Sequence, residues 1–200
     1  MAVSYSIHSQ ILEQPIFQLA EGSSPQHTQL LINTFVDTLL DLSDQIYTKL
    51  KDKCQSIFKE LEHRATLEKQ IVNKSYYDTL IKKLDNFLKR CPTLGFNSSS
   101  YDLNLIKKFL IIALTEKTSI AGVIKRGSHF MSIFTPTLKF TDVRGFVAPG
   151  YSLDKYARAY TRGSHMKTSF CYEYLDKYEK LFETKLPPIQ AFDSSLKNQN

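Results

Sequence analysis

The chain has 200 residues, 42% of them hydrophobic and 23% charged, with a formal net charge of +6. This length and composition allow one hydrophobic core and argue against disorder as the default state. The three cysteines, Cys54, Cys91 and Cys171, are too widely spaced to favour a zinc site or a disulfide framework. Because no apolar stretch is long enough to span a membrane, we expect a soluble, intracellular protein with no membrane partner, in either nucleus or cytoplasm.

Positive charge is concentrated in residues 82–167. This segment holds 15 Lys or Arg residues against five Asp or Glu residues, a net charge of +10, so the remainder of the chain carries −4. A lysine or arginine that neutralises a phosphate releases counterions condensed around the nucleic acid, and this release increases the affinity. The segment therefore favours a nucleic-acid partner slightly over the alternative of a solvated basic face.

The first 90 residues predict an edge strand and two helices. Alternation at Val3, Tyr5 and Ile7 is typical of a strand. Apolar residues at three- and four-residue steps across residues 31–61 predict one long helix with a single apolar stripe. A second periodic run in residues 67–88, less regular at residues 73–78, predicts the other helix of an antiparallel pair. We expect this pair to act as scaffold, without chemistry of its own.

Residues 91–200 predict alternating strands and helices followed by an irregular end. Pro92 ends the preceding helix because proline disfavours the helical conformation of the residue before it. Residues 93–96 predict a short buried strand, and residues 103–114 predict a helix. Alternation in residues 121–125, 130–134 and 138–143 predicts a β-meander. A short helix is expected in residues 151–160, with Ser152 as its cap.

Residues 94–106 combine an apolar strand, a polar turn and a carboxylate at the start of a helix. Asn97, Tyr101 and Asp102 are the candidate functional residues. A carboxylate here can hold a divalent cation near a phosphate, and an aromatic ring can stack on a base with about 1–3 kcal/mol. From the residues alone, a structural interpretation is favoured: Asn97 forms the turn, Tyr101 packs in the core and Asp102 caps the helix.

Asn97, followed after three residues by Tyr101 and Asp102, resembles the second exonuclease motif of family B DNA polymerases. The likeness is closest to the protein-primed polymerases of viruses and Maverick/Polinton transposons. Further segments resemble this family in the same order, at residues 139–143, 146–156, 172–176 with 180–181, and 186–188 with 191–192. The resemblance implies an α/β fold with an incomplete ribonuclease-H-like exonuclease core in residues 91–200. Residues 1–90 then supply an edge strand and a long helical-pair insertion, within a single domain fragment.

The function implied by this resemblance is metal-dependent 3′–5′ proofreading that accompanies DNA replication by a parent polymerase. Asp102 is then a catalytic residue and one ligand of Mg²⁺ or Mn²⁺, while Asn97 and Tyr101 bind the single-stranded 3′ end. Ser152 and Leu153 match a Ser-Leu-x-x-hydrophobic element, which in the family contributes to contacts with single-stranded DNA and the terminal protein. The implied partners are DNA, the terminal protein and the other domains of the polymerase.

Departures from the family pattern limit what this chain is expected to do alone. The first exonuclease motif, Asp-x-Glu on an early strand, is absent before residue 90, and the third is expected beyond Asn200. Tyr172 and Asp176 have the spacing of the third motif but belong to a different segment of the resemblance. No polymerase palm motif is present. We therefore expect a fragment with little or no nuclease activity by itself.

Two alternatives from other functional classes remain open. The first is a non-catalytic, domesticated module that binds single-stranded DNA through the basic surface without metal chemistry. The second is a helical scaffold or partner-binding protein that uses the apolar stripe of residues 31–61, with Phe35 and Leu39 at a dimer interface.

Overall fold

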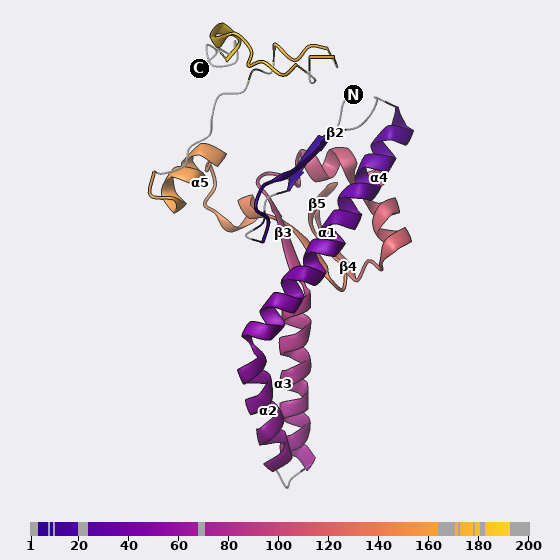
Figure 1. Ribbon diagram of the computed structural model, residues 1–200, viewed down its shortest axis with the longest axis vertical. Helices are drawn as coiled ribbons and strands as arrows, with labels where there is room; N and C mark the ends of the chain where they lie inside the picture. Colours follow the sequence, from indigo (N-terminus) through magenta and orange to yellow (C-terminus); the bar gives the residue numbers. More distant parts are fainter. Residues whose placement is uncertain are drawn as a thin grey trace. The chain divides into compact units, whose positions relative to one another are not determined.

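The computed structural model describes residues 4–7, 9, 11–19, 24–67, 71–163, 171, 173–177, 179–180 and 183–192. The chain divides into two compact units, Met1–Phe146 and Val147–Asn200. The fold is mixed α/β, as expected, with a four-stranded mixed sheet and five α-helices in the described residues (Figure 1).

The first long helix, α1 (Pro25–Lys53), begins at a well-formed cap. Ser24 Oγ accepts a hydrogen bond from the backbone N–H of His27 at 3.2 Å, and Pro25 occupies the first helical turn. The prediction of one helix through residue 61 is wrong, because Cys54 separates α1 from α2 (Gln55–Leu67). The N–H of Cys54 is shared between the carbonyl oxygens of Leu50 and Lys51, which tightens the chain there without disturbing the apolar periodicity.

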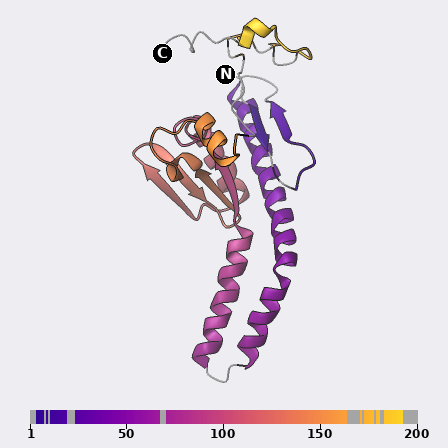
Figure 2. The same cartoon turned by 90° about the vertical axis from the view of Figure 1, so that its left-hand side faces the viewer.

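The third helix, α3 (Ile71–Lys89), packs against α2 and runs in the opposite direction (Figure 1 and Figure 2). The predicted antiparallel pair is therefore confirmed. Helical backbone continues through residues 73–78, where the apolar periodicity of the sequence is less regular. Within the first unit, both views show the α2–α3 pair extending away from the four-stranded sheet.

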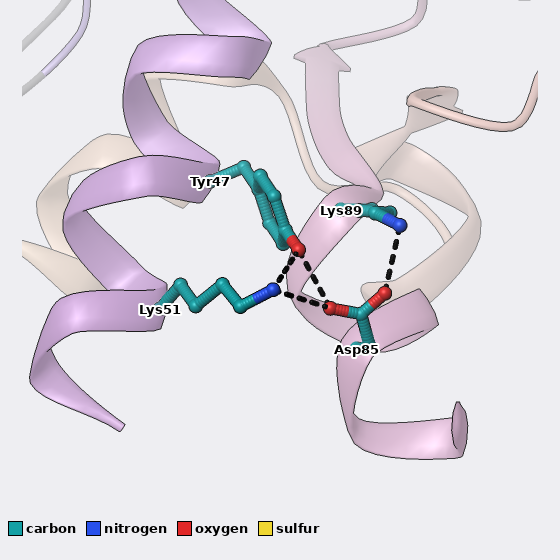
Figure 3. Close-up of polar contacts among 4 residues, drawn as sticks. All are labelled: Tyr47, Lys51, Asp85 and Lys89. Carbon is teal, nitrogen blue, oxygen red and sulfur yellow. Dashed lines mark hydrogen bonds and ion pairs between the residues drawn. The ribbon is translucent and has the colours of Figure 1, made fainter. Parts of the chain in front are cut away.

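A polar cluster joins α1 to α3 near the base of this pair (Figure 3). The hydroxyl of Tyr47 donates to Asp85 Oδ1 at 2.6 Å, and Lys51 Nζ donates to the Tyr47 oxygen at 2.9 Å. Lys89 Nζ lies 2.7 Å from Asp85 Oδ2. The hydrogen bond from Lys89, followed by that from Tyr47, outweighs burial and lowers the pKa of Asp85 to about 2. The cluster therefore holds an ionised carboxylate between the two helices.

The four-stranded sheet has the order β3-β6-β5-β4. Strands β4 (Gly122–Arg126), β5 (His129–Phe134) and β6 (Leu138–Asp142) form an antiparallel meander, whereas β3 (Cys91–Gly95) pairs in parallel with β6. Helix α4 (Asp102–Lys117) connects β3 to the meander. These elements confirm the strands and the helix predicted from the sequence.

The core of the first unit lies between α1, α4 and the sheet. Val36, Leu110, Leu114, Ile133 and Leu138 are essentially inaccessible to solvent and form one cluster. Phe35 and Leu39 also belong to this core or pack against it. Strand β3 is only half-buried, contrary to the prediction of a buried strand, because alternate residues such as Leu94 face solvent.

A second, two-stranded sheet precedes α1. Strand β1 (Ser4–Ile7) confirms the predicted edge strand, and its antiparallel partner β2 (Ile16–Leu19) was not predicted. Ile7 is buried in the same core as α1 and α4. Because β2 has only four residues, its alternation of apolar and polar residues is too short for periodicity alone to identify it.

The second unit contains one α-helix among its described residues. Helix α5 (Leu153–Tyr160) begins as predicted at Ser152, whose hydroxyl accepts a hydrogen bond from the N–H of Lys155 at 3.2 Å. The short 3₁₀ helix η3 (Ile189–Phe192) follows, while η1 (Val143–Phe146) belongs to the first unit. Tyr172 of the resemblance lies outside the described residues. None of the helices in the described ranges is long and apolar enough to cross a membrane.

Candidate functional site at the carboxyl edge of β3 and β6

The parallel pairing of β3 and β6 brings two turns together that are far apart in sequence. Gly95, the last residue of β3, pairs with Asp142, the last residue of β6. The loop of residues 96–101 leaves β3 at this edge and leads into α4, while η1 leaves β6 at the same edge. The candidate residues Asn97, Tyr101 and Asp102 therefore lie beside Asp142.

Asp142 accepts four hydrogen bonds, three of them from the loop of residues 96–101. Its Oδ1 accepts from the backbone N–H groups of Asn97 at 2.8 Å and Arg144 at 2.9 Å. Its Oδ2 accepts from the N–H of Ser99 at 3.0 Å and from the Ser99 hydroxyl at 2.5 Å. Burial favours a raised pKa for this carboxyl, which is 3% exposed, but the hydrogen bonds outweigh it and keep the pKa low. Asp142 is thus an ionised anchor with both oxygens engaged.

Asn97 shapes the turn that Asp142 holds. Its φ is 60°, in the left-handed region that asparagine tolerates better than most residues. Its side-chain oxygen accepts a hydrogen bond from Arg144 Nη1 at 2.6 Å, and its carbonyl oxygen accepts from the N–H groups of Ser100 and Tyr101. The structural interpretation of Asn97 as a turn former is therefore confirmed.

Two further residues close the turn tightly. A Cβ on Gly95 would lie 2.7 Å from Ser98 Cβ, so the approach of the loop to the end of β3 requires glycine. His129 Nδ1, from β5, lies 3.2 Å from the carbonyl oxygen of Ser99, which accepts the bond when this nitrogen carries the proton. Ser98 is buried, and its hydroxyl has no hydrogen-bond partner among the described residues. The loop is packed from both sides.

Asp102 differs from Asp142 because its carboxylate remains accessible. It is the first residue of α4, after Tyr101 at the cap position, so the expectation that Asp102 caps the helix is wrong. Partial burial of the Asp102 carboxylate raises its pKa, and repulsion from the charge of Asp142 raises it further. A hydrogen bond from the backbone N–H of Asp102 lowers the pKa, but by less. Asp102 is therefore an exposed carboxylate near Asp142, and a bound cation would stabilise its negative charge.

The remaining predicted site residues fall in two places. Tyr101 is 63% exposed, so the prediction that it packs in the core is wrong and its ring is free to meet a ligand. Ser152 and Leu153 belong to the second unit. There the Ser152 hydroxyl caps α5, which confirms the structural alternative for that residue, while Leu153 is exposed.

The described residues at this edge do not complete a divalent-metal site. No group of three or more His, Cys, Asp or Glu side chains within the described ranges could hold a metal ion. Both oxygens of Asp142 already accept hydrogen bonds, which leaves Asp102 as the accessible carboxylate of the pair. A two-metal nuclease site needs several clustered carboxylates, so the residues present account for one part of such a site.

The anchoring residues Asp142, Ser99 and Arg144 were not among the candidates named from sequence. Asp142 did occur in a segment of the family resemblance, at the end of a predicted strand. Asp142 could have been identified as a carboxylate at the end of one predicted strand, when another predicted strand also ends in a polar turn that needs a hydrogen-bond acceptor. Only the strand order tells that these two turns share one edge.

Comparison of the chain with protein-family models, curated proteins and solved structures finds no match. The function must therefore be inferred from the geometry of this edge and from the motif resemblance. Both centre on the same residues, Asn97, Tyr101 and Asp102.

Proposed function

We propose that this chain is part of the 3′–5′ exonuclease domain of a protein-primed family B DNA polymerase, with a ribonuclease-H-like core. In this proposal Asp102 is one carboxylate of a site for Mg²⁺ or Mn²⁺ that binds the single-stranded 3′ end of DNA. The observation that carries it is the accessible Asp102 carboxylate at the carboxyl edge of a parallel strand pair, in the first turn of α4. Ligands of open α/β sheets commonly bind at that edge.

The neighbouring residues support a role in holding a nucleic-acid end. Asp142 and Arg144 fix the loop, so that Tyr101 is held at the start of α4 with its ring exposed. An exposed aromatic ring offers a stacking surface to a base of any sequence. The dipole of α4 favours a phosphate at its N-terminal end, although the charge of Asp102 opposes one unless a cation lies between them.

The same geometry limits the chemistry of this chain alone. One accessible carboxylate does not hold a pair of metal ions in place. We therefore expect the purified protein, with Mg²⁺ or Mn²⁺, to degrade 5′-labelled single-stranded DNA no faster than an Asp102→Ala variant. Degradation that depends on Asp102 would contradict the incomplete site.

Metal binding tests the role of Asp102 without any need for activity. Titration with Mn²⁺ should broaden the amide NMR signals of residues near Asp102, because the paramagnetic ion relaxes nearby nuclei. Asp102→Asn should remove this broadening, whereas Asp41→Asn, at an exposed carboxylate of α1, should retain it. Equal broadening in wild type and Asp102→Asn would overturn the proposal.

A second candidate function is a non-catalytic module that binds single-stranded DNA. It is favoured by the net charge of +10 in residues 82–167 and by the saturated hydrogen bonding of Asp142. It predicts affinity that falls steeply with salt and survives Asp102→Ala. The helical-scaffold alternative loses its proposed dimer residues, because Leu39 is buried in the core and Phe35 packs against it.

A further inference from the structure

A groove lies at the opposite end of β3 from the Asp102 edge. It has a volume of about 560 Å³ and is formed by the last turns of α1, the second half of α3, the start of β3 and part of β6. Cys91 and Pro92, at the beginning of β3, belong to its wall, and Lys139 of β6 pairs in register with Pro92. The volume falls in the range of about 300–1,000 Å³ that ligand sites occupy.

The charged residues that line this groove are all cationic. They are Lys83 of α3, Arg90 directly after the end of α3, and Lys139 of β6. The lining contains no Asp or Glu. Lys83 and Arg90 take part in none of the ion pairs among the described residues, in contrast to Lys51 and Lys89, whose charges meet Asp85 (Figure 3). The groove therefore presents three positive charges without a nearby carboxylate in its wall.

An exposed aromatic ring accompanies these charges. Phe87, which lies between Lys83 and Arg90 in the chain, is 77% exposed, and Leu50 of α1 is a second exposed apolar residue of the lining. Lys83, Phe87 and Arg90 are four and three residues apart, so they share one face of the helix and its end. Exposing a phenylalanine to water costs free energy, and an aromatic ring flanked by cations is the combination that single-stranded nucleic acids use.

We propose that this groove binds single-stranded nucleic acid, with Phe87 stacked on a base and Lys83, Arg90 and Lys139 neutralising phosphates. A duplex keeps its bases stacked on one another and cannot offer one to Phe87. An acidic peptide matches the cations but has no systematic need for the exposed ring. The proposal does not depend on Asp102 or on metal binding.

The charge contribution is tested by fluorescence anisotropy of the full chain with labelled oligo-dT of about 20 nucleotides. The variant Lys83→Gln/Arg90→Gln/Lys139→Gln should bind at least tenfold more weakly at low salt. The slope of log affinity against log salt should fall by about 2, since each phosphate contact contributes about 0.7. The matched control is Lys49→Gln/Lys74→Gln/Lys108→Gln, which removes three lysines outside the groove. An equal loss in the control would overturn the proposal.

The stacking contribution is tested with an abasic strand of the same length. Phe87→Ala should weaken oligo-dT binding roughly tenfold and leave abasic binding unchanged, because only the base-bearing strand can stack. Phe17→Ala, at another exposed phenylalanine, should leave both unchanged. Equal losses on the two strands, or no binding at low salt, would overturn the proposal.

Three further measurements test the role of Phe87 against attraction by charge alone and against the proposed metal site. Oligo-U should show the same dependence on Phe87 as oligo-dT, and polyglutamate should compete poorly at equal charge. Polyglutamate that competes as well as oligo-dT would overturn the role of Phe87. Phe87→Ala should weaken oligo-dT binding by the same factor with and without Asp102→Asn. The test of the groove is therefore independent of the proposed metal site. Circular dichroism of each variant confirms that it is folded.

Discussion

Two carboxylates in the first unit, Asp142 and Asp85, each tie together segments that are distant in sequence, and they do so by different means. Asp142 is buried and accepts hydrogen bonds from three backbone N–H groups and one hydroxyl. Asp85 lies at the junction of α1 and α3 and is held by Tyr47, Lys51 and Lys89, with its side chain partly exposed (Figure 3). Both have a lowered pKa.

The difference shows how burial changes the importance of a charge. Removing a buried acceptor leaves its donors without water to replace it, so the loss includes the full desolvation of those donors. Around Asp85, water can solvate the lysines when the carboxylate is removed, and salt screens the ion pairs. We therefore expect the loop at the β3–β6 edge to depend on Asp142 more strongly than the helix junction depends on Asp85.

The largest effect is expected for Asp142→Ala. This change leaves the N–H groups of Asn97, Ser99 and Arg144 without their acceptor, and it should lower the free energy of unfolding by about 3 kcal/mol. Urea denaturation measures the change, with Asp41→Ala as an exposed control expected to stay within about 0.5 kcal/mol. If Asp142→Ala loses no more unfolding free energy than the control, the loop keeps its conformation without the Asp142 carboxylate.

A smaller effect is expected for Gly95→Ala, which tests how tightly the loop approaches β3. The new Cβ would lie 2.7 Å from Ser98 Cβ, and such overpacking costs about 1–3 kcal/mol. Gly122→Ala is the control, because its Cβ would make only an ordinary contact with Phe134 at 3.6 Å. If thermal unfolding shows equal shifts for the two variants, the loop yields more easily than the contact suggests.

The smallest effect is expected at the α1–α3 junction. Tyr47→Phe removes the hydrogen bond to Asp85 and should cost about 1 kcal/mol, as measured by urea denaturation. Tyr76→Phe, at an exposed tyrosine of α3 outside this cluster, provides the control. A loss above that of Gly95→Ala would reverse the order expected for the two regions.

The pH dependence of the junction follows from the pKa of Asp85. Because folding lowers this pKa from 3.8 to about 2, the stabilisation is fully present above about pH 4 and is lost as the pH falls through about 2. The difference in unfolding free energy between wild type and Asp85→Asn should therefore shrink between about pH 4 and about pH 2. A difference that stays constant over this range would show that the carboxylate charge contributes nothing to the junction.

The sequence predicted the local elements well where a period or a breaker was strong. Periodic apolar residues identified the helices, Pro92 marked the end of α3, and alternation identified β5 and β6. The break at Cys54 and strand β2 were not predicted, because the first leaves the helical period intact and the second is four residues long. Tyr101 was misplaced because aromatic character alone does not tell which face of a loop is covered.

By itself, the sequence determined the elements, the concentration of positive charge and the Asn97-to-Asp102 motif, because each depends on residues close together in the chain. Only the tertiary structure decided that Asp142 anchors this motif, since the parallel pairing of β3 and β6 brings together residues 45 positions apart. It likewise decided that Lys139 joins Lys83, Phe87 and Arg90 around one groove. The physical reason is that period and propensity act along the chain, whereas strand order decides which distant side chains share an edge.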